Sequence, residues 1–164
     1  MEISYILLGT NLGDRNQNLQ TALTHIEKIG EVISKSSIYE SEPWGVQNQQ
    51  NFLNMVIELQ INFNPQELLS ELLAIEKKMG RERKQKWEAR LIDLDILYFK
   101  NLIINELDLV IPHPFLQERR FTLEPLCEIA PMMLHPILSK TNAELLEICP
   151  DKLFVSKLGE LTKL

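Results

Sequence analysis

The order of apolar and polar residues along the chain predicts four main β-strands. A nearly continuous apolar run over 2–8 is typical of a buried strand, and the alternation over 52–61 is typical of a strand with one apolar face. A less strongly alternating stretch predicts another strand over 31–42. In the run 91–99, acidic residues alternate with apolar ones, so a fourth strand is expected there.

Two helices are predicted between these strands, because apolar residues recur every three or four positions. The first helix ends at Gly30, and its apolar stripe consists of Leu19, Leu23, Ile26 and Ile29. The start of the second is marked by Asn64 as the cap, Pro65 at the first helical position and Glu67 reaching back to the cap. This second helix is expected to end at Gly80.

The order strand-helix-strand-strand-helix-strand predicts an α+β fold. It is typical of a ferredoxin-like βαββαβ sandwich, with both helices on one face of a mixed antiparallel sheet and the other face open to a ligand. A short extra strand is expected over 102–104. A mostly helical C-terminal extension follows, with helices over 115–129 and after a cap at Thr141. We expect residues 1–164 to form a single domain.

Composition places the chain among ordinary globular proteins. Its 164 residues are 45% apolar and 24% charged, which suffices for one domain with a real core. No apolar run approaches the roughly 18 residues that span a bilayer, and the chain opens without a secretory signal. Cys127 and Cys149 have neither metal-site nor disulfide spacing. We therefore expect a cytoplasmic protein with reduced thiols and no membrane association.

Charge is distributed unevenly along the chain. The stretch 77–90 holds seven basic and two acidic residues, whereas the whole chain carries a net charge of −6. A basic segment on an acidic protein favours a small anionic ligand over nucleic acid, which the remaining surface would repel. The alternative is a solvated helix end and loop, in which Lys77 and Lys78 merely favour the helix C-terminus.

Asp93 and Asp95 are the strongest candidates for chemistry. Alternate side chains of a strand share a face, so the two carboxylates should point the same way. The residues expected on the opposite face are Ile92, Leu94, Ile96 and Tyr98. Paired carboxylates repel one another and lose hydration, and Mg²⁺ bound together with phosphates relieves both costs. The alternative is an edge strand whose acidic residues deter aggregation.

His113 and Arg119 are candidates for binding phosphate. His113 lies between Pro112 and Pro114, whose rings restrict the backbone and so fix the direction of the imidazole. Arg119 could bind phosphate through two parallel hydrogen bonds. The alternatives are a structural loop histidine and a solvated surface arginine.

Phe52, Asn54 and Phe121 are candidates for binding a flat heterocycle. Phe52 and Asn54 share one face of their strand, and the amide of Asn54 offers both a donor and an acceptor to a ring edge. Phe121 could stack on the other side of such a ring. The alternative is that both aromatic residues belong to the core.

Several short motifs follow one another over nearly the first three quarters of the chain. The first group is Leu8-Gly9-Thr10-Asn11-Leu12-Gly13-Asp14, Tyr39 through Pro43 with Gly45, and Asn51-Phe52-Leu53-Asn54. The second is Glu76, Gly80-Arg81-Glu82-Arg83, Trp87 with Arg90, Ile92 through Leu97, and Pro112-His113-Pro114 with Arg119 and Phe121. In this order the set resembles the 6-hydroxymethyl-7,8-dihydropterin pyrophosphokinases of folate biosynthesis.

The resemblance implies a reaction and its participants. Pyrophosphate would pass from ATP, as cosubstrate, to the hydroxymethyl oxygen of the pterin, with release of AMP and without a covalent enzyme intermediate. It implies two Mg²⁺ ions at Asp93 and Asp95, and catalytic roles for these two residues with Arg81 and Arg90. Small molecules would be the partners, nucleic acid would not bind, and we expect a monomer.

The resemblance also implies two sets of binding residues. Those expected to contact or enclose ATP are Glu76, Arg81, Arg83, Lys86, Trp87, Arg90, Ile96, His113 and Arg119. Those expected to bind the pterin are Ser41, Glu42, Trp44, Phe52, Asn54 and Phe121.

The chain departs from the family pattern at a few positions. Glu88-Ala89 stands where Gly-Pro is common, which changes the backbone preferences. Lys86 stands where Arg is usual, and a lysine cannot form the two parallel hydrogen bonds that a guanidinium forms with phosphate. Thr10 replaces the usual Ser, and Trp44 a smaller apolar residue.

Two other functions use the same residues. A two-metal phosphohydrolase or nuclease would hold its ions with the same aspartates but use water as the nucleophile. A ferredoxin-like regulatory module would bind ATP without turnover.

Overall fold

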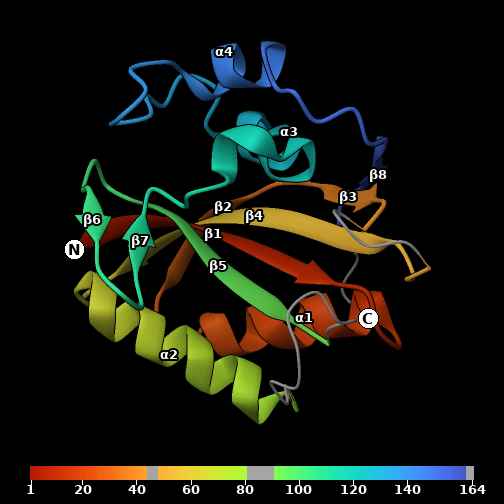
Figure 1. Ribbon diagram of the computed structural model, residues 1–164. Helices are drawn as coiled ribbons and strands as arrows, with labels where there is room; N and C mark the ends of the chain where they lie inside the picture. Colours follow the sequence, from red (N-terminus) through yellow and green to blue (C-terminus); the bar gives the residue numbers. More distant parts are fainter. Residues whose placement is uncertain (44–47, 81–90, 162–164) are drawn as a thin grey trace.

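The computed structural model describes residues 1–43, 48–80 and 91–161 of the chain. Its centre is a six-stranded sheet in the order β5-β1-β4-β3-β8, with β2 also paired to β4 (Figure 1). The strands are β1 (Glu2–Thr10), β2 (Glu31–Lys35), β3 (Ile38–Ser41), β4 (Phe52–Ile61), β5 (Asp93–Phe99) and β8 (Val155–Gly159). Each pairing between these strands is antiparallel. The predicted α+β sandwich is confirmed.

Helices α1 (Arg15–Ile26) and α2 (Pro65–Lys78) lie together on one face of the sheet (Figure 1). Their apolar stripes pack against the sheet in a core that includes Leu19, Leu68 and Ile57. The predicted start of α2 is confirmed, because the Asn64 side chain accepts the N–H of Glu67 at 2.9 Å and the Glu67 carboxylate accepts the N–H of Asn64 at 2.8 Å.

The opposite face is less open than the sequence suggested. Helices α3 (Arg120–Ile129) and α4 (Asn142–Glu147) and the short 3₁₀ helix η1 (Leu116–Glu118) form a second layer there (Figure 1). With Leu7, Val56 and Leu97 of the sheet they make a second core. The expectation of a free face is therefore wrong for the centre of this face, because the C-terminal extension packs onto it.

The strand expected over 31–42 is two strands, broken at Ser36 and Ser37. The N–H of Ser36 donates to the carbonyl of Val56 at 2.9 Å, but the N–H of Val56 is accepted by the hydroxyl of Ser36, also at 2.9 Å. The N–H and hydroxyl of Ser37 both donate to Glu128 of α3, at 3.1 and 2.9 Å. Contacts with the second helical layer thus interrupt the strand.

A β-bulge in β5 changes the face of one predicted residue. Tyr5 lies opposite Tyr98, but its neighbour Ile6 lies opposite Ile96, so Leu97 is an extra residue. Ile96 stays in the core beneath α1 and α2, whereas Tyr98 turns to the core beneath α3 and α4. The expectation that Tyr98 shares the face of Ile96 is wrong for this reason.

The extra strand and the C-terminal extension also differ in detail. The strand expected over 102–104 is β6 (Ile104–Asn105), which pairs with β7 (Val110–Ile111) in a separate two-stranded sheet. The helix expected over 115–129 is divided at the extended residue Arg119 into η1 and α3, a helix follows the cap at Thr141 as expected, and the extension ends in β8, an additional strand of the main sheet. Among the helices in the described ranges, none is long and apolar enough to cross a bilayer.

Candidate active site

Three neighbouring strands bring the predicted site residues onto one face. Gly9 of β1 lies opposite Asn54 of β4 on one side and opposite Asp93 of β5 on the other. Leu7 likewise lies opposite Asp95. Side chains of directly opposed residues point to the same face of a sheet. Both aspartates therefore share the face of Asn54, as a continuous surface across β4, β1 and β5.

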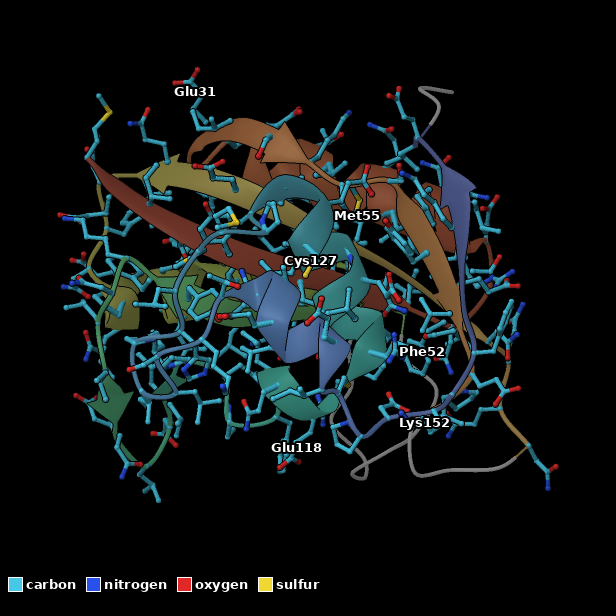
Figure 2. The ribbon with its side chains drawn as sticks, turned by 90° about the horizontal axis from the view of Figure 1, so that it is seen from above. Glu31, Phe52, Met55, Glu118, Cys127 and Lys152 are labelled. Atoms are coloured by element: carbon cyan, nitrogen blue, oxygen red, sulfur yellow. The ribbon has the colours of Figure 1, made fainter. Side chains whose placement is uncertain are left out.

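Gly9 leaves room in the middle of this surface. A Cβ atom at Gly9 would lie 3.3 Å from Oδ1 of Asn54 and 3.8 Å from Cδ1 of Phe52. The side chains of Asn54 and Phe52 therefore extend over β1, into space that any larger residue would narrow. Figure 2 looks onto this face, with α3 and α4 over the centre of the sheet and Phe52 to the side of α3 on which β8 runs.

Asn54 is held in place by Ser41. The Asn54 amide nitrogen donates to the Ser41 hydroxyl at 2.8 Å, and both residues are 2% exposed. Ser41 lies opposite Phe52 in the pairing of β3 with β4. The next residue, Glu42, is exposed. Ser41 thus orients the amide that we expect to recognise a ring edge.

The backbone between the two aspartates is fixed from α2. β5 lies at the edge of the sheet, where N–H groups on the outer side need acceptors other than a neighbouring strand. Glu76, only 2% exposed, supplies one, because its carboxylate accepts the N–H of Leu94 at 2.8 Å. Glu76 therefore holds the segment that presents Asp93 and Asp95.

The aspartates themselves are half-buried. Within residues 1–43, 48–80 and 91–161, no cluster of three or more His, Cys, Asp or Glu residues could hold a metal ion. A metal ion at the two aspartates would therefore need further ligands of another kind, such as phosphate oxygens and water. The side chain of Ile96 points away from this surface into the core, so only its backbone could face a ligand on the aspartate side.

His113 lies beside β5, because its N–H donates to the carbonyl of Leu97 at 2.9 Å. Burial, together with the smaller effect of the Arg119 charge, lowers the pKa of His113 to about 4, although the charge of Asp93 opposes the shift. The ring is therefore neutral at pH 7. Its Nδ1 atom accepts the N–H of Phe115 at 3.2 Å, so the proton is on Nε2. That N–H is a donor suited to a phosphate oxygen.

Arg119 lies among aromatic rings at the start of α3. Its guanidinium carbon is 4.9 Å from the centroid of the Phe115 ring and 5.7 Å from that of Phe121. Phe121 is half-buried and packs against the second core. Arg119 and Phe121, expected to contact ATP and pterin respectively, are thus direct neighbours.

The structure brings together a large part of the predicted set. Gathered around this surface are Ser41, Phe52, Asn54, Asp93, Asp95, His113, Arg119 and Phe121, with Glu76 behind it. Six predicted residues lie outside the described residues, namely Trp44, Arg81, Arg83, Lys86, Trp87 and Arg90. Sequence reasoning gave no role to Gly9 or Phe115. The signals for Gly9 were its place at the end of an apolar strand and within the first family motif, and the signal for Phe115 was its place close to His113.

Comparisons with known proteins agree with this geometry. A sequence model of the family described as 7,8-dihydro-6-hydroxymethylpterin-pyrophosphokinase (HPPK) matches residues 5–131. The 2-amino-4-hydroxy-6-hydroxymethyldihydropteridine pyrophosphokinase of Aquifex aeolicus is 43% identical over 144 residues, which are 88% of this chain and 90% of that protein. The enzyme of the same name from Bacillus subtilis is 45% identical over 129 residues, 77% of each chain.

Solved structures show the same fold. Plasmodium falciparum HPPK-DHPS, in its wild-type form with SDX-DHP, superimposes with a TM-score of 0.74 at 16% identity and covers 89% of this chain. The form with pteroate gives 0.73 at 19% identity. This chain spans less than half of those chains, 44% and 42%.

The sequence matches define a transferase that uses ATP. The chain belongs to the 7,8-dihydro-6-hydroxymethylpterin-pyrophosphokinase family. It is an ATP-dependent diphosphotransferase of folate synthesis.

The ionisation of His113 gives a first test. The free protein should keep this imidazole neutral, with the proton on Nε2, from pH 7 down to pH 5.5, and should protonate it only near its pKa of about 4. Because the unfolded chain binds this proton at the ordinary pKa of 6.5, the free energy of unfolding should fall as pH drops from 6.5 towards 4. NMR titration of the ring nitrogens, assigned with His113→Gln, measures the pKa. A midpoint near 6.5 would show that the imidazole is not buried as described.

Proposed function

We propose that the surface formed by Asp93, Asp95, Asn54 and Phe121 carries out the transfer. The β and γ phosphates of ATP pass together to the hydroxymethyl oxygen of 6-hydroxymethyl-7,8-dihydropterin, and AMP leaves. The observation that carries this proposal is the register of β4, β1 and β5 at Gly9. It puts Asn54, which would recognise the edge of the pterin ring, in one row with the carboxylate of Asp93. A pterin at Asn54 and a triphosphate at the aspartates would then lie next to each other.

The residues present fit a magnesium site. Mg²⁺ is usually held by one or two carboxylates plus substrate phosphates, and Asp93 and Asp95 provide such a pair on one face. We propose that the two carboxylates hold two Mg²⁺ ions together with the triphosphate. Bound there, the metal ions would neutralise phosphate charge and stabilise both the attacking and the leaving oxygen. Glu76 keeps the two carboxylates in position through the backbone of Leu94.

The pterin would bind between two aromatic rings. Phe52 extends over Gly9 from β4, and Phe121, in the first turn of α3, would lie on the other side of the ring. Asn54, oriented by Ser41, would hydrogen bond to the polar edge of the ring. Glu42 and Trp44 would complete the pocket through their backbone, although Trp44 lies outside the described residues.

The triphosphate would extend from the aspartates towards α3. The Nε2–H of His113 would donate to a phosphate oxygen, and the guanidinium of Arg119 would bind another. We also expect Glu76 and the backbone of Ile96 to contact ATP. Arg81, Arg83, Lys86, Trp87 and Arg90, with Arg81 and Arg90 in catalytic roles, are proposed to enclose the nucleotide from outside the described residues.

This chemistry needs positioning and charge neutralisation rather than a protein nucleophile. The two cysteines are poor candidates for a covalent step. Burial, reinforced by the charge of Glu124, raises the pKa of Cys127 to about 11, and Cys149 is buried. We therefore propose direct transfer between the two substrates, without a covalent enzyme intermediate.

We propose further that the protein acts as a monomeric, single-domain enzyme of the cytoplasm on small molecules alone. The shared central sheet, which separates two cores, supports a single domain. The net charge of −6 disfavours nucleic acid as a partner. Incubation with ATP, Mg²⁺ and the dihydropterin should release AMP, and release of ADP instead would contradict the proposed reaction.

Replacing an aspartate should mainly slow the reaction. Asp95→Ala or Asp93→Ala should lower kcat by roughly 100-fold or more, because metal-assisted charge stabilisation contributes several kcal/mol and about 1.4 kcal/mol is tenfold in rate. AMP release under saturating substrates measures kcat. Asp108→Asn, on the exposed turn between β6 and β7, is the charge-matched control and should keep the wild-type rate. Equal rates for wild type and Asp95→Ala would disprove the metal assignment.

Removing the ring of Phe121 should weaken pterin binding more than nucleotide binding. The loss of stacking in Phe121→Ala should cost about 1–3 kcal/mol, a rise in the pterin Kd of roughly 5- to 150-fold. Calorimetry with an ATP analogue, Mg²⁺ and the dihydropterin gives both constants. Phe63→Ala removes an aromatic ring from the core on the other face and should leave the pterin Kd unchanged. If Phe121→Ala binds pterin like wild type, Phe121 does not line the pocket.

A further inference from the structure

The segment 151–159 connects the two sides of the proposed pterin pocket. At its start, Asp151 contacts Arg120, the first residue of α3 and the neighbour of Phe121 in the chain. At its end, β8 pairs with β3, the strand that contains Ser41. This segment lies beyond residues 5–131, which the family model matches. The sequence motifs gave it no role in the site.

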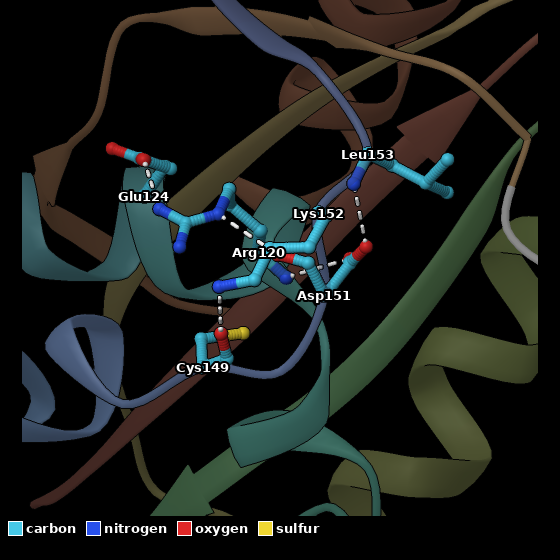
Figure 3. A network of polar contacts seen from close by, with 6 residues as sticks. All are labelled: Arg120, Glu124, Cys149, Asp151, Lys152 and Leu153. Atoms are coloured by element: carbon cyan, nitrogen blue, oxygen red, sulfur yellow. Dashed lines mark hydrogen bonds and ion pairs between the residues drawn. The ribbon is translucent and has the colours of Figure 1, made fainter.

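Asp151 and Arg120 form the contact at α3 (Figure 3). One carboxylate oxygen of Asp151 accepts the N–H of Arg120 at 3.0 Å, and the other accepts the N–H of Leu153 at 3.0 Å. The Nε atom of Arg120 donates back to the carbonyl of Asp151 at 3.1 Å. Asp151 is 9% exposed, so this contact is largely shielded from water.

This contact takes the place of a local helix cap. The first N–H groups of a helix lack partners within the helix, and a nearby side chain usually accepts from them. The residue at the cap position of α3 is Arg119, whose guanidinium has no acceptor atom. Asp151, 31 positions beyond Arg120, supplies the acceptor, and its negative charge suits the helix N-terminus.

The other end of the segment reaches the opposite wall of the pocket. Val155, the first residue of β8, lies opposite Ser41, and Lys157 lies opposite Tyr39. Ser41 is the residue that holds the amide of Asn54. Four residues after Asp151 the chain is thus paired with the strand that orients Asn54.

We propose that Asp151 is a positioning residue for pterin binding. It holds the backbone at 119–121, and through β8 it sets where Phe121 lies relative to Asn54. Arg119, which precedes the capped residue, is positioned by the same contact. This inference rests on the proposed function, in which Phe121 and Asn54 bind the pterin.

The proposal separates binding from general stability. Asp151→Ala should raise the Kd for 6-hydroxymethyl-7,8-dihydropterin roughly tenfold in the presence of an ATP analogue and Mg²⁺, which is a loss of about 1.4 kcal/mol of binding free energy. At saturating pterin, kcat should change less than the Kd. Asp151→Asn keeps one acceptor oxygen but loses the charge, so its Kd should lie between those of wild type and Asp151→Ala.

A matched control is the cap of α4. The Thr141 hydroxyl accepts the N–H of Glu144 at 3.2 Å, away from the proposed pocket. Thr141→Ala should lower the Tm to an extent similar to that of Asp151→Ala, yet leave the pterin Kd at the wild-type value. Calorimetry gives the Kd and thermal unfolding gives the Tm for all four proteins.

The outcomes distinguish two failures. If wild-type protein binds the dihydropterin but Asp151→Ala binds it equally well, or if Thr141→Ala weakens it as much, the positioning role is wrong. If wild-type protein itself does not bind the dihydropterin, the proposed function fails instead. Should Asp151→Ala not fold, Asp151→Asn decides, and a wild-type Kd in that variant overturns the inference.

Discussion

The proposed site depends on the antiparallel register of β4, β1 and β5. Because Gly9 lies between Asn54 and Asp93, the amide proposed to bind the pterin edge and a carboxylate proposed to bind metal ions occupy one row of the sheet. A shift of one residue in either pairing would turn one of these side chains to the opposite face, beneath α1 and α2. The apolar core on that face makes such a shift costly, so the core that stabilises the fold also sets the geometry of the site.

Other contacts refine this arrangement from outside the row. Glu76 fixes the backbone between the aspartates, and Ser41 fixes the amide of Asn54. On the far side of the proposed pocket, the start of α3 carries Arg119 and Phe121, and Asp151 caps this helix. Substrate binding by this protein would therefore rely on residues spread from the first strand to the last.

What the sequence predicted well is what local patterns determine. The strand over 52–61, the capping box at Asn64 and the shared face of Asp93 and Asp95 follow from residue spacing alone, and the structure confirms them. The chemistry of the residues also marked His113, Arg119, Phe52, Asn54 and Phe121 as candidates, and family resemblance supplied the others. The structure gathers most of the described ones around one surface.

What the sequence did not predict depends on contacts between distant residues. The break at Ser36 and Ser37 involves Glu128 of α3, and β8 forms only because β3 offers a free edge. The bulge at Leu97 moves the side chain of Tyr98 to the other face of the sheet, and it lies inside the run 91–99, which gives no sign of it in the sequence. None of these features leaves a periodic signal, because each is set by packing of the C-terminal layer.

The most direct test is a crystal structure with a non-hydrolysable ATP analogue, Mg²⁺ and 6-hydroxymethyl-7,8-dihydropterin. The account predicts that the carboxylates of Asp93 and Asp95 coordinate metal ions bound to the phosphates, with the pterin at Asn54 on the same face of the sheet. Metal ions bound away from both aspartates, or a pterin on another face, would contradict it.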